Sequence, residues 1–75
     1  MDKPAMAAHE VLRAGSWTGA SDRVLLDHDS RFLRRKRLTT ATGREIVADL
    51  PATVSLDHGD ALRLSDGTIV EIVAA

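Results

Sequence analysis

Residues 29–51, which read DSRFLRRKRLTTATGREIVADLP, contain the pattern that decides the fold. Residues 32–40 and 44–50 are predicted to form two strands joined by a glycine turn. In the second of these segments every other side chain is apolar, which is typical of a strand with one buried face. Because proline cannot donate to a sheet ladder, the Leu50-Pro51 step is expected to end that strand.

The same two-residue alternation continues on both sides of this pair. Further short strands are predicted at residues 11–14, 23–28, 61–64 and 68–73, a short helical turn at 52–56, and a disordered start at 1–8. Asp66-Gly67, between the last two strands, favours a hairpin with a two-residue type I′ turn. About six short strands at spacings of about 8–12 residues predict an all-β domain, a small barrel or sandwich.

Composition limits the classes of protein that the chain can represent. Its 75 residues fit one domain, with 10 Lys and Arg against 11 Asp and Glu and a net charge of −1, whereas nucleic-acid modules are more often clearly basic. The absence of cysteine excludes disulfides and thiolate metal sites. No apolar run approaches the roughly 20 residues that cross a bilayer, and the start lacks the apolar segment of a signal peptide. We therefore expect a single cytoplasmic domain without a membrane contact.

A basic run stands out on the first of the two strands. Five cations fall within seven residues: Arg31, Arg34, Arg35, Lys36 and Arg37. On an extended strand Arg35 and Arg37 point opposite to Arg34 and Lys36, so one set faces water while the other must avoid the core or find anions.

Carboxylates on neighbouring segments are the expected anions, because the guanidinium fork binds carboxylates in a bidentate way. The candidates are Asp27, Asp29, Glu45 and Asp49. Three interpretations of the run remain open: a charged edge strand that resists aggregation, a docking patch for an acidic protein surface, and a nucleic-acid site. The last is disfavoured because one Trp, one Phe and no Tyr offer few platforms for stacking bases.

The three histidines give no recognisable metal motif. His9, His28 and His58 are the only strong ligands for a metal such as nickel, and none has H-x-H, H-x-x-x-H or H-E-x-x-H spacing. We interpret His28 and His58 as hydrogen-bonding or turn residues; the alternative is a nickel or zinc site that they form with an aspartate. No G-x-S-x-G context or phosphate-binding glycine loop is present, so an enzyme is not expected.

The single tryptophan also allows two interpretations. Trp17 precedes a Thr-Gly step in a segment of turn composition. A lone tryptophan in a small domain usually covers the core. The alternative is that it lines a peptide-binding groove, since a small β domain with an open edge can accept a partner strand.

The order of these motifs resembles the N-terminal domain of the UreE family of urease accessory proteins, which are nickel metallochaperones. The clearest part is a D-x-R-x-x-R-R-x-x-L pattern at Asp29, Arg31, Arg34, Arg35 and Leu38. The pattern continues with Gly43, Leu50-Pro51, Gly59-Asp60, Asp66-Gly67 and the closing VEIVAA of residues 70–75. The resemblance implies a small β structure of two short sheets, similar to the peptide-binding domain of Hsp40-type chaperones.

The resemblance also implies a role. The family continues into a C-terminal domain that dimerises and carries the nickel-binding histidine, and this sequence stops where that domain would begin. We therefore expect no metal site or cofactor in residues 1–75, with nickel and the homodimer confined to the missing domain. The expected partners are the urease accessory GTPase and the urease apoprotein. The expected docking residues are Phe32, Arg34, Arg35, Lys36 and Arg37; the alternative function is a small RNA-binding barrel that uses residues 31–37.

Overall fold

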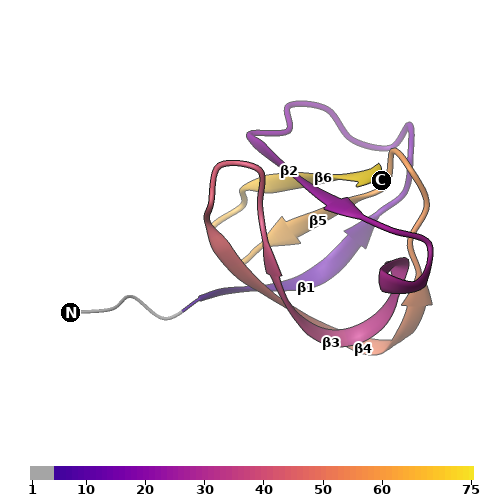
Figure 1. The fold of residues 1–75 in the computed structure, drawn as a ribbon. Coiled ribbons are helices and arrows are strands. Elements are labelled where there is room, and N and C mark those ends of the chain that lie inside the picture. Colours follow the sequence, from indigo (N-terminus) through magenta and orange to yellow (C-terminus); the bar gives the residue numbers. More distant parts are fainter. Residues whose placement is uncertain (1–4) are drawn as a thin grey trace.

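Six strands and one short 3-10 turn make up residues 5–75, the part of the chain that the computed structural model describes (Figure 1). Their bounds are β1 Met6–Leu12, β2 Asp22–Leu26, η1 Asp29–Arg31, β3 Phe32–Thr39, β4 Glu45–Ser55, β5 Ala61–Leu64 and β6 Ile69–Ala74. The prediction of an all-β domain with about six strands is confirmed. No helix in residues 5–75 is long and apolar enough to cross a membrane.

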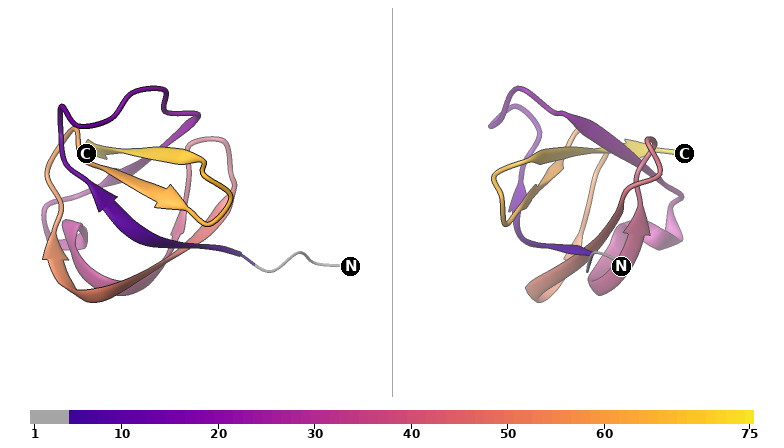
Figure 2. Two further views of the ribbon diagram at one scale, coloured as in Figure 1. Left: turned by 180° about the vertical axis from the view of Figure 1, so that it is seen from behind. Right: turned by 90° about the vertical axis from the view of Figure 1, so that its left-hand side faces the viewer.

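The strands are joined in one sheet in the order β2-β6-β5-β1-β4-β3, so β2 and β3 are its edges. β1 lies in the middle because Ala8 is opposite Ala48 of β4 on one side and Leu64 of β5 on the other. The β1–β4 and β2–β6 pairs are parallel and the others antiparallel. The resemblance implied two short sheets; here a single sheet curls strongly, so that its β6/β5 half and its β4/β3 half face each other (Figure 2).

The concave side of the curled sheet holds the core. The alternation predicted for residues 44–50 is confirmed, since Ile46, Ala48 and Leu50 are at most 2% exposed. Alternate residues of the other strands meet them there, namely Ala8, Val24, Leu26, Leu62, Leu64, Val70 and Ile72. Burying each large aliphatic side chain stabilises the fold by about 1.5–3 kcal/mol, so this one-sided pattern drives the curling.

Two expectations about the strand limits are wrong. Residues 6–8 form the start of β1, where pairing with both neighbours and the full burial of Ala8 order them. The strand expected at 11–14 therefore begins earlier and ends at Leu12, and residues 1–4 lie outside the described part. β4 also does not end at Leu50-Pro51, and residues 52–55 continue it where a helical turn was predicted.

The reason lies in the register between β3 and β4. Asp49 is opposite Arg35, but Val54 is opposite Leu33, so β4 has extra residues in a bulge between these pairs. Pro51 falls within the bulge, where the ladder needs no N–H from it.

The two hairpins use the same three-residue loop. The Asp66-Gly67 hairpin is confirmed, but its predicted type I′ turn is wrong, because only the glycine has a positive φ, of 89°. The Leu64 N–H donates to the Thr68 carbonyl at 2.8 Å, and the Gly67 N–H donates back to the Leu64 carbonyl at 2.9 Å. This is a type I turn followed by a glycine bulge. The Asp66 carboxylate accepts the Thr68 N–H at 2.9 Å and so adds a hydrogen bond across the loop.

The β3–β4 hairpin repeats this arrangement at Gly43, which has φ 87°. The tip of this hairpin contacts β2, because the Ala41 N–H donates to the Arg23 carbonyl at 2.7 Å. The Thr42 hydroxyl donates to the Asp22 carboxylate, also at 2.7 Å. Slight burial opposes the charge of Asp22, but hydrogen bonds from Thr40, Thr42 and the Arg23 amide lower the pKa of this carboxyl below its usual value. The hairpin tip therefore fixes the two edges of the sheet relative to each other at one end.

A buried carboxylate ties the loops at the opposite end together. Asp60 is 2% exposed and accepts three hydrogen bonds of 2.9 Å, from the Ala14 N–H, the Asp57 N–H and the Arg13 guanidinium. Burial alone would raise the pKa of Asp60, but the two amides and the guanidinium outweigh it and hold that pKa below its usual value. Asp60 thus joins the end of β1 to the β4–β5 loop.

Candidate functional site

The five predicted docking residues all lie on β3, an edge of the sheet. Phe32 is 66% exposed, and the four cations that follow it are exposed as well. Leu33 and Leu38 are the buried side chains of this strand and anchor it to the core. The core therefore holds the strand while the run of cations remains at the surface.

The structure divides the four cations into two pairs. Arg35 and Arg37 project from the convex face and meet carboxylates of β4: Arg35 Nε lies 3.2 Å from Asp49 Oδ1, and Arg37 Nη1 lies 2.9 Å from Glu45 Oε2. Two of the four expected anions are therefore confirmed as partners. These exposed ion pairs neutralise half of the basic run and contribute little stability, about 0–1 kcal/mol each.

Arg34 and Lys36 make no ion pair with any residue in 5–75. Arg34 lies at the register shift of β3, where its Nε donates to the Leu50 carbonyl at 3.4 Å. Lys36 is opposite the buried Ala48, yet it is exposed because β3 has no further strand beside it. These two side chains carry the positive charge of the edge that is not held in an ion pair. Hydrogen bonds from Ser30, and after them the charge of Lys36, lower the pKa of the Asp27 carboxyl below its usual value.

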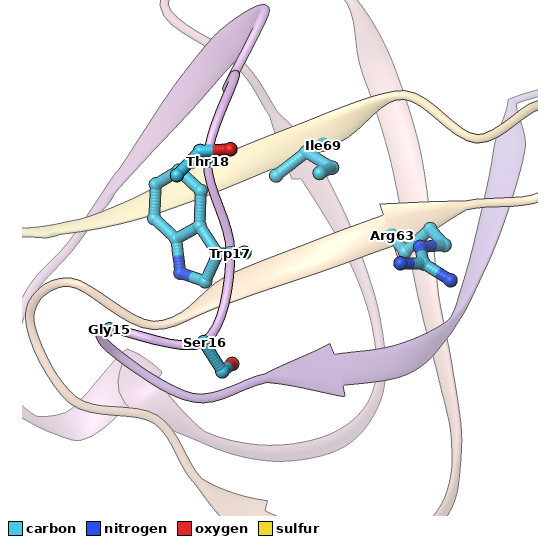
Figure 3. A pocket seen from close by; sticks show the side chains of 6 residues that line it. All are labelled: Gly15, Ser16, Trp17, Thr18, Arg63 and Ile69. Atoms are coloured by element: carbon cyan, nitrogen blue, oxygen red, sulfur yellow. The ribbon is translucent and has the colours of Figure 1, made fainter.

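Trp17 lies in the β1–β2 connection and lines a shallow hollow of about 360 Å³. Figure 3 shows its indole next to Thr18, above the strands that carry Ile69 and Arg63. The indole N–H donates to the Gly59 carbonyl at 3.0 Å, which holds the ring in place. The ring is half-buried and lies outside the core cluster, so it is one wall of a surface hollow.

Each histidine forms a local contact through Nδ1. The His9 Nδ1–H donates to the Asp49 carbonyl at 2.9 Å, the Arg31 guanidinium donates to His28 at 3.3 Å, and the Ala74 N–H donates to His58 at 3.0 Å. Within residues 5–75 no group of three or more His, Asp or Glu side chains is arranged to hold a metal ion. The geometry accounts for His58 as a hydrogen-bonding residue of a turn.

Comparison with known proteins adds the family. Residues 6–75 match the family described as UreE urease accessory protein, N-terminal domain. The chain belongs to this family. The resemblance predicted from the motifs of residues 29–75 is therefore confirmed.

Whole UreE proteins are longer than this chain. It is 49% identical over 75 residues to the urease accessory protein UreE of Ruegeria pomeroyi, covering all of the chain and 49% of that protein. The UreE protein of Rhodobacter capsulatus is 49% identical over 65 residues, which cover 87% of the chain and 42% of that protein. The UreE protein of Cereibacter sphaeroides is 51% identical over 69 residues, which cover 91% of the chain and 38% of that protein. The chain thus spans about half the length, or less, of these relatives.

The sequence did not reveal two features of the surface. Arg63 joins the Trp17 hollow from β5 and pairs with Glu10 of β1 at 3.2 Å, a contact that depends on which strands are neighbours. The split of the basic run into paired and unpaired cations likewise depends on the register of β3 against β4. Alternation predicts that Arg35 and Arg37 point opposite to Lys36. Only the position of β4 shows that Arg35 and Arg37 are the pair with carboxylate partners.

Proposed function

We propose that this domain is the docking part of a nickel chaperone and that it binds the urease maturation machinery through β3. Membership of the UreE N-terminal family supports the role, because the relatives are named urease accessory proteins. The observation that carries the docking surface is the exposed charge of Arg34 and Lys36, which form no ion pair within residues 5–75, next to the exposed Phe32. The proposed partners are the urease accessory GTPase and the urease apoprotein, in the cytoplasm.

In this proposal the domain carries neither the metal nor a catalytic group. Its histidines are engaged in local contacts, and nickel would be bound by another part of a whole UreE protein. The RNA-binding alternative has less support, because Phe32 is the one aromatic residue on β3 and Trp17 lies in a different connection. Binding of single-stranded nucleic acid typically needs successive stacking platforms along the basic surface.

A capture experiment tests the docking surface. The immobilised domain is incubated with the purified complex of urease apoprotein and accessory GTPase, and the retained complex is quantified. The double variant Arg34→Glu/Lys36→Glu is expected to retain about tenfold less, because reversing two exposed charges at an interface changes binding by roughly 1–2 kcal/mol.

A control with one reversed charge is compared with each single variant, Arg34→Glu and Lys36→Glu, so that the change in net charge is the same. Arg23→Glu reverses an exposed cation on β2, the other edge, which makes no ion pair within residues 5–75. This control is expected to retain the complex like the unmodified domain, and all variants should unfold at similar urea concentrations. Equal capture by the double variant and the unmodified domain would remove β3 from the proposal.

A further inference from the structure

The backbone of β3, like its charged side chains, is available for binding a partner. β3 is the last strand of the sheet order, and it contains no proline. Within residues 5–75, its outer edge accepts no hydrogen bond from another loop or strand. The row of backbone groups on this edge ends at Ala41, whose N–H already donates to the Arg23 carbonyl of β2, so the hairpin end of this edge is occupied and its free part lies further back, at Arg35 and Arg37.

The register shows which backbone groups of β3 are free. The Thr40 N–H donates to the Arg44 carbonyl at 2.8 Å, so this pair is hydrogen-bonded. In an antiparallel ladder, hydrogen-bonded and non-bonded pairs alternate. Counting back along β3, Leu38 and Lys36 are bonded to β4. The residues between them therefore direct their N–H and C=O groups away from β4, namely Arg35, Arg37 and Thr39.

An independent contact agrees with this count. Asp49, which is opposite Arg35, should turn its own carbonyl away from β3 and towards β1. Its carbonyl does accept the His9 Nδ1–H of β1, at 2.9 Å. The free edge of β3 therefore offers a row of donors and acceptors at every second residue.

We propose that this edge binds an extended, acidic segment of a partner protein as an added β-strand. The inference rests on the proposed docking function and specifies its mode. The peptide backbone would bond to Arg35 and Arg37, while its acidic side chains would meet Arg34 and Lys36. Strand addition of this kind takes affinity from the main chain and selectivity from alternate side chains.

The positive charge of β3 determines which kind of strand can pair with its edge. A second copy of the chain paired through β3 would place its own cations beside those of the first copy, and like charges directly opposite each other destabilise a strand pair. Because Arg35 and Arg37 already have carboxylate partners, the added strand needs its acidic side chains next to Arg34 and Lys36. The favoured segment is thus a strand with acidic residues at alternate positions, and Phe32 offers it an apolar contact at one end.

Amide hydrogen exchange gives the decisive measurement. The probe is a short capped peptide that alternates glutamate and threonine, titrated into the domain. In the free domain the amides of Arg35 and Arg37 should exchange fast, and those of Lys36 and Leu38 slowly. At a peptide concentration of about ten times Kd, exchange at Arg35 and Arg37 should slow about tenfold, because only the unbound fraction exchanges.

Backbone methylation supplies the matched control, because it blocks hydrogen bonding without changing charge. One peptide is N-methylated at every glutamate and a second at every threonine. Only one set of amides can face β3, so one methylated peptide should fail to bind and the other should bind. Which one fails also gives the orientation of the added strand. Any other pattern overturns strand addition.

Further outcomes separate this inference from the docking function. If the peptide binds without protecting Arg35 and Arg37, the contact is purely electrostatic and strand addition is wrong. If single-stranded RNA protects these amides as well as the peptide does, the preference for an acidic protein segment is wrong. If the peptide fails while the urease apoprotein–GTPase complex is still captured through Arg34 and Lys36, the inference fails and the docking function stands.

Discussion

Replacing Asp60 with alanine is expected to destabilise the domain severely, although the residue lies far from β3. The change leaves two partly buried amides, those of Ala14 and Asp57, without their acceptor at 2.9 Å. A fully buried donor without a partner costs about 1–3 kcal/mol; these two amides are only partly buried, so the expected loss is about 2–4 kcal/mol. The Arg13 guanidinium adds little, because its side chain is 55% exposed and water can replace the carboxylate.

This loss is large for so small a domain. At about 0.05–0.15 kcal/mol per residue, the 75-residue chain has a total stability of roughly 4–11 kcal/mol. The assay is urea unfolding followed by the fluorescence of Trp17. Asp57→Ala is the control, because it removes an exposed carboxylate three positions away and keeps the Asp57 amide. A loss below about 1 kcal/mol for Asp60→Ala would refute the reasoning.

The variant Asp60→Asn keeps the test usable if the alanine variant does not fold. One acceptor oxygen remains, so about half of the loss is expected. The pKa of Asp60 is lower in the folded domain than its ordinary value of 3.8. Its charge therefore stabilises the fold fully above that ordinary value, and this contribution disappears as the pH falls through the folded pKa. Asparagine cannot titrate, so the stability difference between the unmodified domain and Asp60→Asn should shrink below about pH 4.

Three further predictions follow from other parts of the structure. Gly43→Ala should cost about 1–2 kcal/mol in urea unfolding, because the φ of 87° is strained for any residue with a Cβ, and an unchanged midpoint would contradict the turn assignment. Phe32→Ser should leave stability within about 0.5 kcal/mol, since the ring is 66% exposed, while weakening capture of the urease complex; a large loss of stability would place the ring in the core. Calorimetry with nickel at neutral pH should find no site tighter than about micromolar, and a tight stoichiometric site would show that histidines held by local contacts are still available as ligands.

Local patterns predicted the strands and their buried faces well. Alternation in residues 44–50 identified the inward side chains, and the Asp66-Gly67 and Thr42-Gly43 steps located the hairpins. Both depend on interactions within a few residues, which a sequence displays directly. Pro51 was misjudged because its tolerance depends on a bulge that exists only when β4 is aligned with β3.

The long-range pairings could not be predicted in the same way. Nothing near Met6 or Ala8 indicates that a parallel partner lies at Ile46 and Ala48, so residues 6–8 appeared too weak to be ordered. For the candidate site, the order of residues in the sequence showed the run of cations on β3. It also placed Asp49 and Glu45 among their expected partners. It could not show that Arg34 and Lys36 remain unpaired, because that depends on the strand register.

The central position of β1 has a consequence for how the domain forms. Met6 pairs with Ile46 and Leu12 pairs with Ala61, so the middle of the sheet closes only after residues 46–64 have left the ribosome. Closing such long loops is entropically costly and slows folding, which places this domain among the slower small folders. A nascent chain would meanwhile expose its apolar residues, and a cellular chaperone that shields them would raise the yield of folded protein.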